Sequence, residues 1–290
     1  MPNKSSHLHP SFTQPLDYLV FGHLTSDLTE TGSRLGGTAA FSGLTANALG
    51  LKSGIITSFG KELDISPIKG LWFKNKISKK TTTFKNISNG SERSQYLYSV
   101  AKKIIKEDVP TLIQPPKIIH LGPVANEVDP EIMTCFPNSL KCLTAQGWFR
   151  GIGKQKQVIF QEWQHFDQYL EKADIVVISL DDVQKDEDKI AIMAGLIPVF
   201  VVTENNKGAR VYWHNDVRFF SAPEVKYLDD TGAGDVFATA FFYRYLFTKN
   251  PWEACRFAVL LASWSVTRAY LNSIPTPKEI EQAKIELLTN

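Results

Sequence analysis

The sequence has few cysteines, and their arrangement argues against two common kinds of stabilising site. The three cysteines among its 290 residues, Cys135, Cys142 and Cys255, include no Cys-x-x-Cys pair and no Cys/His spacing typical of zinc. An odd, scattered set of this kind favours neither a disulfide framework nor a metal-binding cluster. We therefore expect reduced thiols and a cytoplasmic protein.

Long apolar runs and an excess of charge of one sign are also missing. No apolar stretch approaches the ~20 residues that span a bilayer, and 32 basic residues nearly balance 30 acidic ones. A near-neutral chain exerts no broad attraction on nucleic acid or on an anionic membrane, so neither is expected as a partner. Residues 1–15 are polar and proline-containing, lack the apolar centre of a secretory signal, and are predicted to form a flexible tail.

The chain does contain a regular alternation of short apolar runs and longer helical segments. Strands are expected at residues 18–21, 54–59, 117–121, 174–178 and 198–202. Helices are expected at residues 41–49, 163–172, 186–195, 234–247, 251–268 and 277–288. This alternation predicts the α/β class, with a doubly wound, mostly parallel sheet flanked by helices in a single domain over residues 16–290.

One region departs from that rhythm. Residues 81–84 and 94–100 alternate polar and apolar side chains around a turn that contains Asn86, Asn89 and Gly90. Strict alternation predicts a β-hairpin with one solvated face. We expect this hairpin, at about residues 78–102, to form a small β lid over the edge of the sheet where α/β proteins bind ligands.

The strongest chemical signal is the segment Leu228-Asp229-Asp230-Thr231-Gly232-Ala233-Gly234-Asp235, directly before a helical run. Glycine and alanine permit a tight turn that brings backbone N–H groups close to a ligand. At a helix N-terminus such groups form an anion site for phosphate oxygens. Asp235 could there accept a proton from an attacking hydroxyl during phosphoryl transfer. An Asp in this position can also simply cap the helix.

This segment resembles the C-terminal signature of the ribokinase/PfkB family of carbohydrate kinases, and further stretches resemble that family in the same order. They are Gly22 with Asp27, Gly36-Gly37-Thr38-Ala39-Ala40, Ser179-Leu180-Asp181-Asp182, the loop from Val202 to Ala209, and Ser265–Arg268 with Ser273-Ile274-Pro275. The resemblance runs from Val20 to about Glu279. It implies a ribokinase-like fold and an enzyme that phosphorylates a hydroxyl of a small sugar or polyol with ATP and Mg²⁺.

The resemblance also implies roles for individual residues. Asp235 would be the general base, and the amides of Gly232, Ala233 and Gly234 would form the anion hole. The residues expected to bind the substrate are Asp27, Gly36, Gly37, Thr38, Gln146 and Arg150. Those expected to bind the nucleotide are Thr203, Asn205, Gly208 and Thr231. Asp182 is the candidate for the metal, and Asp229 matches a residue that helps hold a monovalent cation in many members.

Several positions differ from the family pattern. Phe41 stands where many members have a substrate-binding Asn, and Thr38 stands where ribokinases have Lys, which argues against ribose. Ala269-Tyr270 replaces a Gly near the cation loop, so the need for a monovalent cation is left open. The interval from Asp27 to Gly36 is expected to be only a short turn. A small lid of this kind favours a monomer or a weak homodimer.

Other interpretations of the same residues remain open at this point. Asp27 could close a turn, Gly36-Gly37 could lead into a helix, and Gln146 with Arg150 could form a surface loop. The truncated first loop and the Gln146–Arg150 region resemble the inositol-kinase-like branch, whereas a nucleoside kinase is an alternative within the family. A catalytically weak sugar- or nucleotide-sensing protein is the alternative outside enzymes, although such a sensor would not need the base at Asp235.

Overall fold

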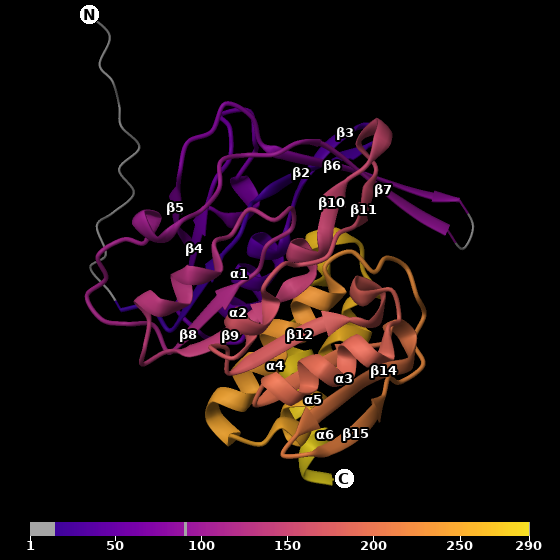
Figure 1. The fold of residues 1–290 in the computed structure, drawn as a ribbon. Helices are drawn as coiled ribbons and strands as arrows, with labels where there is room; N and C mark the ends of the chain where they lie inside the picture. Colours follow the sequence, from indigo (N-terminus) through magenta and orange to yellow (C-terminus); the bar gives the residue numbers. More distant parts are fainter. Residues whose placement is uncertain (1–14, 90–91, 290) are drawn as a thin grey trace, which may run out of the picture.

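Strand β1 (Tyr18–Phe21) shows why the central sheet is covered on both of its faces. Tyr18 and Val20 pack into a hydrophobic core on one face, and Leu19 and Phe21 pack into a second core on the other. Successive side chains of a strand point to opposite faces, so a strand buried on both sides is apolar throughout. This arrangement is seen in a computed structural model that describes residues 15–89 and 92–289 (Figure 1).

The central sheet is mostly parallel. In spatial order its strands are β15 (Asp216–Ser221), β14 (Gly208–Trp213), β13 (Val199–Thr203), β12 (Ile175–Ser179), β9 (Leu140–Thr144), β8 (Ile118–Leu121), β1, β4 (Ser53–Thr57) and β5 (Trp72–Asn75). All neighbours from β13 to β5 pair in parallel, whereas β14 pairs antiparallel with both β13 and β15. The antiparallel edge of β14 and β15, like the outer strand β5, is not among the strands that the periodicity predicted.

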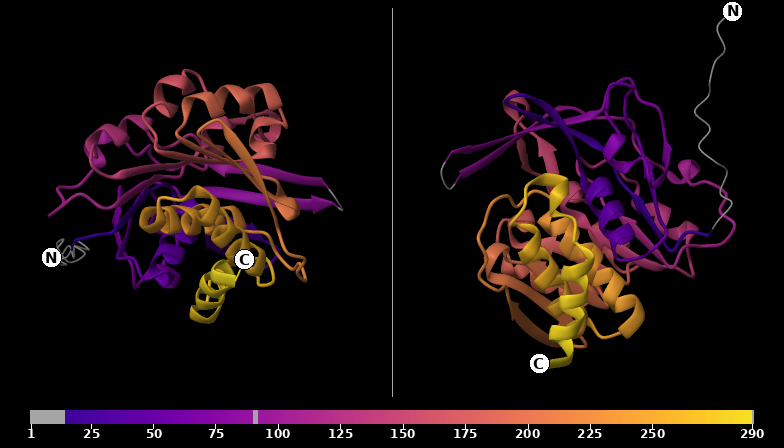
Figure 2. Two further views of the ribbon diagram at one scale, coloured as in Figure 1. Left: turned by 90° about the horizontal axis from the view of Figure 1, so that it is seen from below. Right: turned by 180° about the vertical axis from the view of Figure 1, so that it is seen from behind.

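Helices cover the two faces of the sheet in separate layers (Figure 2). One layer packs on the face of Tyr18 and contains α1 (Thr38–Ala48), α4 (Ala233–Thr248), α5 (Pro251–Ser265) and α6 (Pro277–Thr289). The other packs on the face of Leu19 and contains α2 (Phe166–Leu170) and α3 (Glu187–Leu196). The predicted α/β class is therefore confirmed, with boundaries close to those expected for α3 to α6.

Short 3₁₀ helices form part of the connections. They lie at Ser66–Ile68, Lys106–Asp108, Pro130–Cys135, Ala145–Phe149, Lys154–Lys156, Leu180–Val183, Asn205–Lys207 and Tyr270–Ser273. The helix expected at residues 163–172 is only α2, because His165 adopts a left-handed φ of 57° before it. Trp163 instead stacks on Trp148, with ring centroids 4.4 Å apart.

The lid is larger than the sequence predicted. It is a second sheet in the order β3 (Gly32–Gly36), β2 (Thr25–Thr29), β6 (Thr82–Asn89) and β7 (Glu92–Ser99). Its β6–β7 hairpin extends away from the body of the molecule (Figure 1). The expectation of a short turn between Asp27 and Gly36 is wrong, since β2 and β3 form an antiparallel hairpin there. β2 also pairs in parallel with β6, which joins the two hairpins.

Two further features complete the fold. The short antiparallel ribbon of β10 (Arg150–Ile152) and β11 (Val158–Phe160) contacts the lid at its strand β7. Gly90 of the expected lid turn, and residues 1–14 of the expected tail, lie outside the described residues. Within the described ranges, no helix combines the length and the apolar character needed to cross a membrane.

Candidate active site

A cleft of about 1290 Å³ opens where the carboxyl ends of the parallel strands face the lid. This edge of an open α/β sheet is where such folds bind ligands. All but one of the residues predicted as base, anion hole, substrate, nucleotide or metal ligands line the cleft. They are Asp27, Gly37, Thr38, Gln146, Arg150, Asp182, Thr203, Asn205, Gly208, Thr231, Gly232, Ala233, Gly234 and Asp235.

The exception is Gly36, which is buried and does not line the cleft. A Cβ atom on Gly36 would lie 2.2 Å from Asp27 Oδ2, so the glycine allows β3 to approach that carboxylate. Gly37 has a φ of 90° and precedes α1, and a Cβ atom there would lie 2.3 Å from the His23 carbonyl oxygen. The Gly-Gly pair therefore shapes the turn that delivers Thr38 to the cleft.

The N-terminus of α4 is formed by the motif around Gly232. Gly232 is the N-cap, with a left-handed φ of 83°, and a Cβ atom there would lie 2.1 Å from the Phe41 ring. Asp229 supports the turn by accepting from the Thr231 N–H at 2.9 Å. The Ala233 N–H donates to the Asp230 carbonyl at 3.0 Å. The N–H groups of Gly234 and Asp235 fall in the first turn, where a helix supplies no acceptor of its own.

Asp235 is the third residue of α4 and is half-buried in the cleft. Burial raises the pKa of its carboxyl group to about 6, while a hydrogen bond from Thr38 and the charge of Arg150 lower it and the charge of Asp27 raises it. A carboxyl group with this pKa is ionised at neutral pH and remains basic enough to accept a proton.

Asp27 stands at the lid end of the cleft, on β2. The residue is 8% exposed, and its carboxylate accepts from Thr25 Oγ1 at Oδ1, at 2.8 Å, and from Tyr270 Oη at Oδ2, at 3.2 Å. The Arg34 guanidinium lies 4.9 Å from the centre of the Tyr270 ring. Burial and the neighbouring Asp27 raise the pKa of Tyr270, so its hydroxyl keeps its proton and remains a donor.

A chain of hydrogen bonds links three other predicted residues to Asp235. Arg150 Nη2 donates to Gln146 Oε1 at 2.9 Å, and Gln146 Nε2 donates to Thr38 Oγ1 at 3.2 Å. Thr38 in turn makes a side-chain hydrogen bond to Asp235. The 3₁₀ helix at Ala145–Phe149 places Gln146 and Arg150 on this side because it follows directly from the end of β9.

The opposite end of the cleft is built largely from loop backbone. Asn205 has a φ of 52°, a left-handed conformation that Asn tolerates better than most residues. Gly208 has a φ of 125°, and a Cβ atom there would lie 1.9 Å from the Phe220 carbonyl oxygen. The lining also includes apolar residues from the segment before α4 and from α5 and its C-cap, namely Val225, Tyr227, Val259, Ala262 and Val266.

Asp182 lines the cleft beside that loop and is half-buried. Burial raises its pKa, and the hydrogen bond from the Ser179 N–H, at 2.8 Å from Oδ2, opposes that rise. Across the described ranges, no group of three or more His, Cys, Asp or Glu side chains is placed to hold a metal ion. Asp182 still fits magnesium, which keeps several waters and typically takes one or two carboxylates plus substrate phosphates.

Sequence reasoning missed several residues of the cleft. Thr25, Phe84, Asn86, Gln95 and Val124 all line its lid end. Gln95 Nε2 donates to Asn86 Oδ1 at 2.9 Å across the β6–β7 hairpin. The alternating pattern of these strands could have placed Phe84 and Asn86 on one face, because residues two apart share a face.

Comparisons with known proteins agree with the fold and the motifs. Residues 161–279 match the model of the pfkB family carbohydrate kinase. No curated protein matches the sequence. A pyrophosphate-dependent kinase of the ribokinase family, solved with a pyrophosphate analogue and myo-inositol, is 19% identical with a TM-score of 0.77, over 92% of this chain and 99% of that one.

Two further solved structures share the fold. The Arabidopsis thaliana ribokinase complexed with ribose and ATP is 16% identical with a TM-score of 0.69, over 93% of this chain and 99% of that one. The Methanocaldococcus jannaschii nucleoside kinase is 16% identical with a TM-score of 0.67, over 95% and 99%. This chain thus has the ribokinase-like fold, and its residues 161–279 match the pfkB family carbohydrate kinase model, which confirms the predicted resemblance.

Proposed function

We propose that this protein transfers the γ-phosphoryl group of ATP to a hydroxyl of a small, neutral polyol. The observation that carries the proposal is Asp235, a carboxylate with a pKa of about 6 at the N-terminus of α4, in a cleft with a polar end and an apolar end. A base near neutrality beside backbone N–H donors is the combination that phosphoryl transfer to an alcohol requires.

In the proposed step, Asp235 accepts the proton of the acceptor hydroxyl while that oxygen forms a bond to the γ-phosphorus. The bond from the γ-phosphorus to the bridging oxygen of ADP breaks, and ADP leaves with that electron pair. The first-turn N–H groups of α4 stabilise negative charge on the transferring group. A magnesium ion, when bound with the nucleotide, would neutralise phosphate charge near Asp182.

The shape of the cleft supports a nucleotide donor. Pyrophosphate is a conceivable alternative, because one protein of the same fold is described as pyrophosphate-dependent. The cleft lining includes the apolar residues Val225, Val259, Ala262 and Val266, a surface that pyrophosphate, which has no apolar group, would not cover. An adenine ring would bury such a surface favourably.

The polar end supports a neutral polyol acceptor. Its lining includes Thr25, Thr38, Asn86, Gln95 and Gln146, which offer hydroxyl and amide groups to an array of hydroxyls. Arg150, the cation among the described residues that line this end, donates to Gln146 and to the Val124 carbonyl. A sugar phosphate would call for a cluster of cations, whereas the fold relative that was solved with myo-inositol points to an uncharged ring of hydroxyls.

The proposed reaction gives no role to a monovalent cation. Asp229, the residue that the resemblance associates with such an ion, accepts from the Thr231 N–H through Oδ1 at 2.9 Å and from the Tyr270 N–H through Oδ2 at 3.1 Å. Both carboxylate oxygens are thus used to join the α4 turn to the segment after α5.

A donor-by-acceptor screen tests the function. The purified protein is incubated with Mg²⁺ and either ATP or pyrophosphate, against inositols, sugars, sugar phosphates and nucleosides, and phosphorylated product is measured by mass spectrometry. We expect product with ATP and a neutral polyol. Product with pyrophosphate only would overturn the donor assignment, and product with a sugar phosphate only would overturn the acceptor class. Silence across the panel, with ligand-induced thermal stabilisation, would instead indicate a sensor.

A further inference from the structure

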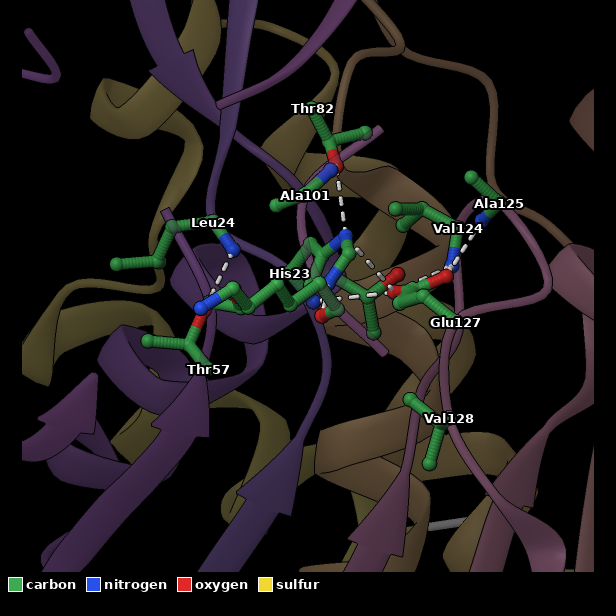
Figure 3. Close-up of polar contacts among 12 residues, drawn as sticks. His23, Leu24, Thr57, Thr82, Ala101, Val124, Ala125, Glu127 and Val128 are labelled. Carbon is green, nitrogen blue, oxygen red and sulfur yellow. Dashed lines mark hydrogen bonds and ion pairs between the residues drawn. The ribbon is translucent and has the colours of Figure 1, made fainter. Parts of the chain in front are cut away.

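The lid joins the body of the protein at a buried polar cluster around His23 and Glu127 (Figure 3). His23 lies between β1 and β2, and Glu127 lies in the loop that follows β8. Neither is among the residues assigned to the site, and both are buried, Glu127 being 1% exposed. A buried carboxylate is costly unless its oxygens accept hydrogen bonds, so its partners indicate its role.

One arm of the cluster holds the lid. His23 Nε2 donates to the Lys102 carbonyl at 2.9 Å, and His23 Nδ1 lies 2.6 Å from Oγ1 of Thr82, the first residue of β6. Thr82 Oγ1 also accepts from the Ala101 N–H at 2.9 Å. The entry to β6, the exit from β7 and the entry to β2 therefore meet at one imidazole ring (Figure 3).

The other arm is the carboxylate of Glu127. It accepts from the N–H of His23 at 3.1 Å, from the N–H of Val124 at 3.0 Å, and from the N–H of Ala125 at 2.7 Å. Three backbone donors on one carboxylate fix the loop at residues 122–127 against the root of the lid (Figure 3). Hydrogen bonds to a charged acceptor are stronger than neutral ones, so this loop is held firmly.

That loop reaches the active site through Val124. The Val124 carbonyl accepts from Arg150 Nη1 at 3.0 Å. From Arg150 the hydrogen bonds continue through Gln146 and Thr38 to Asp235. A continuous series of contacts thus runs from the root of the lid to the carboxylate at the N-terminus of α4.

We propose that Glu127 is a positioning residue that couples the seating of the lid to the placement of Arg150 beside Asp235. The inference rests on the proposed function, because it takes Asp235 as the base. Glu127 acts through the Val124 carbonyl, and it touches no reacting atom.

The charges around Asp235 make this coupling measurable. Burial and the charge of Asp27 raise the pKa of Asp235, whereas Arg150 and the Thr38 hydrogen bond lower it, and the Tyr18 hydroxyl below it stays protonated. If Arg150 loses its anchor, the pKa of Asp235 rises. Because the base must be ionised, the acid limb of kcat/KM, expected near pH 6 in the wild type, then moves to higher pH.

The test compares three variants in full-length protein. In Glu127→Gln, an amide NH₂ replaces one oxygen and cannot accept from the loop N–H groups. Thr82→Val removes the hydroxyl that contacts His23 and the Ala101 N–H at the root of the lid, and it keeps the contacts that lead from Glu127 through Val124 to Arg150. Asp129→Asn, two residues along the same loop, alters a carboxylate that accepts from the Glu131 N–H at 3.0 Å and serves as the matched control.

We expect Glu127→Gln to shift the acid limb upward by about half a pH unit and therefore to lower kcat/KM about twofold near pH 6. Thr82→Val should raise the acceptor KM and leave the acid limb in place, and Asp129→Asn should change neither. Arg150→Met should move the limb in the same direction as Glu127→Gln. An unmoved limb in Glu127→Gln, with only reduced thermal stability, would overturn the proposal.

Two measures keep this test separate from the test of the function. If Glu127→Gln does not fold, Glu127→Asp keeps the charge at shorter reach and should give a smaller shift of the same sign. The pKa of Asp235 can also be followed by carbon-13 NMR titration, which needs no turnover. A rise in Glu127→Gln supports the coupling even in a protein without kinase activity, whereas an unchanged value refutes it.

Discussion

The two ends of the cleft, which we propose bind the phosphoryl donor and the acceptor (the donor end and the acceptor end), are built by different means. The donor end is made of turns whose backbone geometry excludes side chains, such as Gly208, Gly232 and the left-handed Asn205. The acceptor end is made of side chains from β2, α1, β6, β7 and the segment after β9, which hold one another by hydrogen bonds. The family match, at residues 161–279, covers most of the donor end and none of the lid.

This contrast explains how one scaffold can keep its chemistry while its acceptor changes. A phosphate site made of backbone N–H groups depends on conformation, and only a few residue types permit that conformation. A site made of side chains that hydrogen-bond to one another can change by single substitutions. Substitutions at the donor end should therefore change kcat or stability, whereas substitutions at the acceptor end should change the acceptor KM.

The largest expected effect is at the base. Asp235→Asn should lower kcat by about a thousandfold, because the amide cannot accept the proton, while nucleotide binding by calorimetry is retained. Since the folded pKa of about 6 lies above the ordinary value of 3.8, the ionised carboxylate disfavours the folded state above pH 6. The variant should thus be at least as stable at pH 8. Asp230→Asn, in the same turn, is the control, and an equal loss there would contradict the assignment.

A smaller effect is expected on the donor turn. Gly232→Ala places a Cβ atom against Phe41 at a φ of 83°, whereas Gly50→Ala has a φ of 86° and nothing within 4 Å. Gly50→Ala should cost about 1 kcal/mol of unfolding free energy, and Gly232→Ala about 2–4 kcal/mol with a lowered kcat. Urea unfolding measures both. Equal losses of unfolding free energy in the two variants would show that the contact with Phe41 is unimportant. In a Phe41→Ala background, the cost of Gly232→Ala should fall towards that of Gly50→Ala.

The smallest effect is expected on the acceptor side. Tyr270→Phe removes the donor to Asp27 Oδ2 and should raise the acceptor KM about three- to tenfold, with kcat and the KM for ATP unchanged. Tyr227→Phe, at the opposite end of the cleft, is the matched control and should leave the acceptor KM alone. A fall in kcat in Tyr270→Phe would mean that the two ends are less separate than the structure indicates.

The difference between the ends also sets what the sequence could predict. β1 and α4 follow from local pattern, since their apolar residues and their glycine turn are contiguous in the chain. The hairpin of β2 and β3 was missed because three of the five residues of β3 are exposed and its neighbour β2 pairs with β6 across a long interval. The contact of Tyr270 with Asp27 joins residues 243 positions apart, and no local pattern carries that information.

The candidate site divides in the same way. The turn around Asp235 could be identified because glycines and acids stand close together in sequence. Asn86 and Gln95 could not be recognised as cleft residues, since amides on a solvated strand face are ordinary surface groups until a lid orients them. No sequence pattern pointed to Glu127. Its hydrogen bonds come from backbone N–H groups, which residues carry whatever their side chain.

The pairing of β2 with β6 has a consequence for engineering this protein. Thr25 lies opposite Thr82, so half of the lid belongs to the chain before α1 and half to the chain between β5 and β8. A transplant of the β6–β7 hairpin alone would carry Asn86 and Gln95 but leave their parallel partner behind. The lid is therefore a composite of two insertions, and a graft that changes the acceptor has to move both of them together with the residues at their shared root.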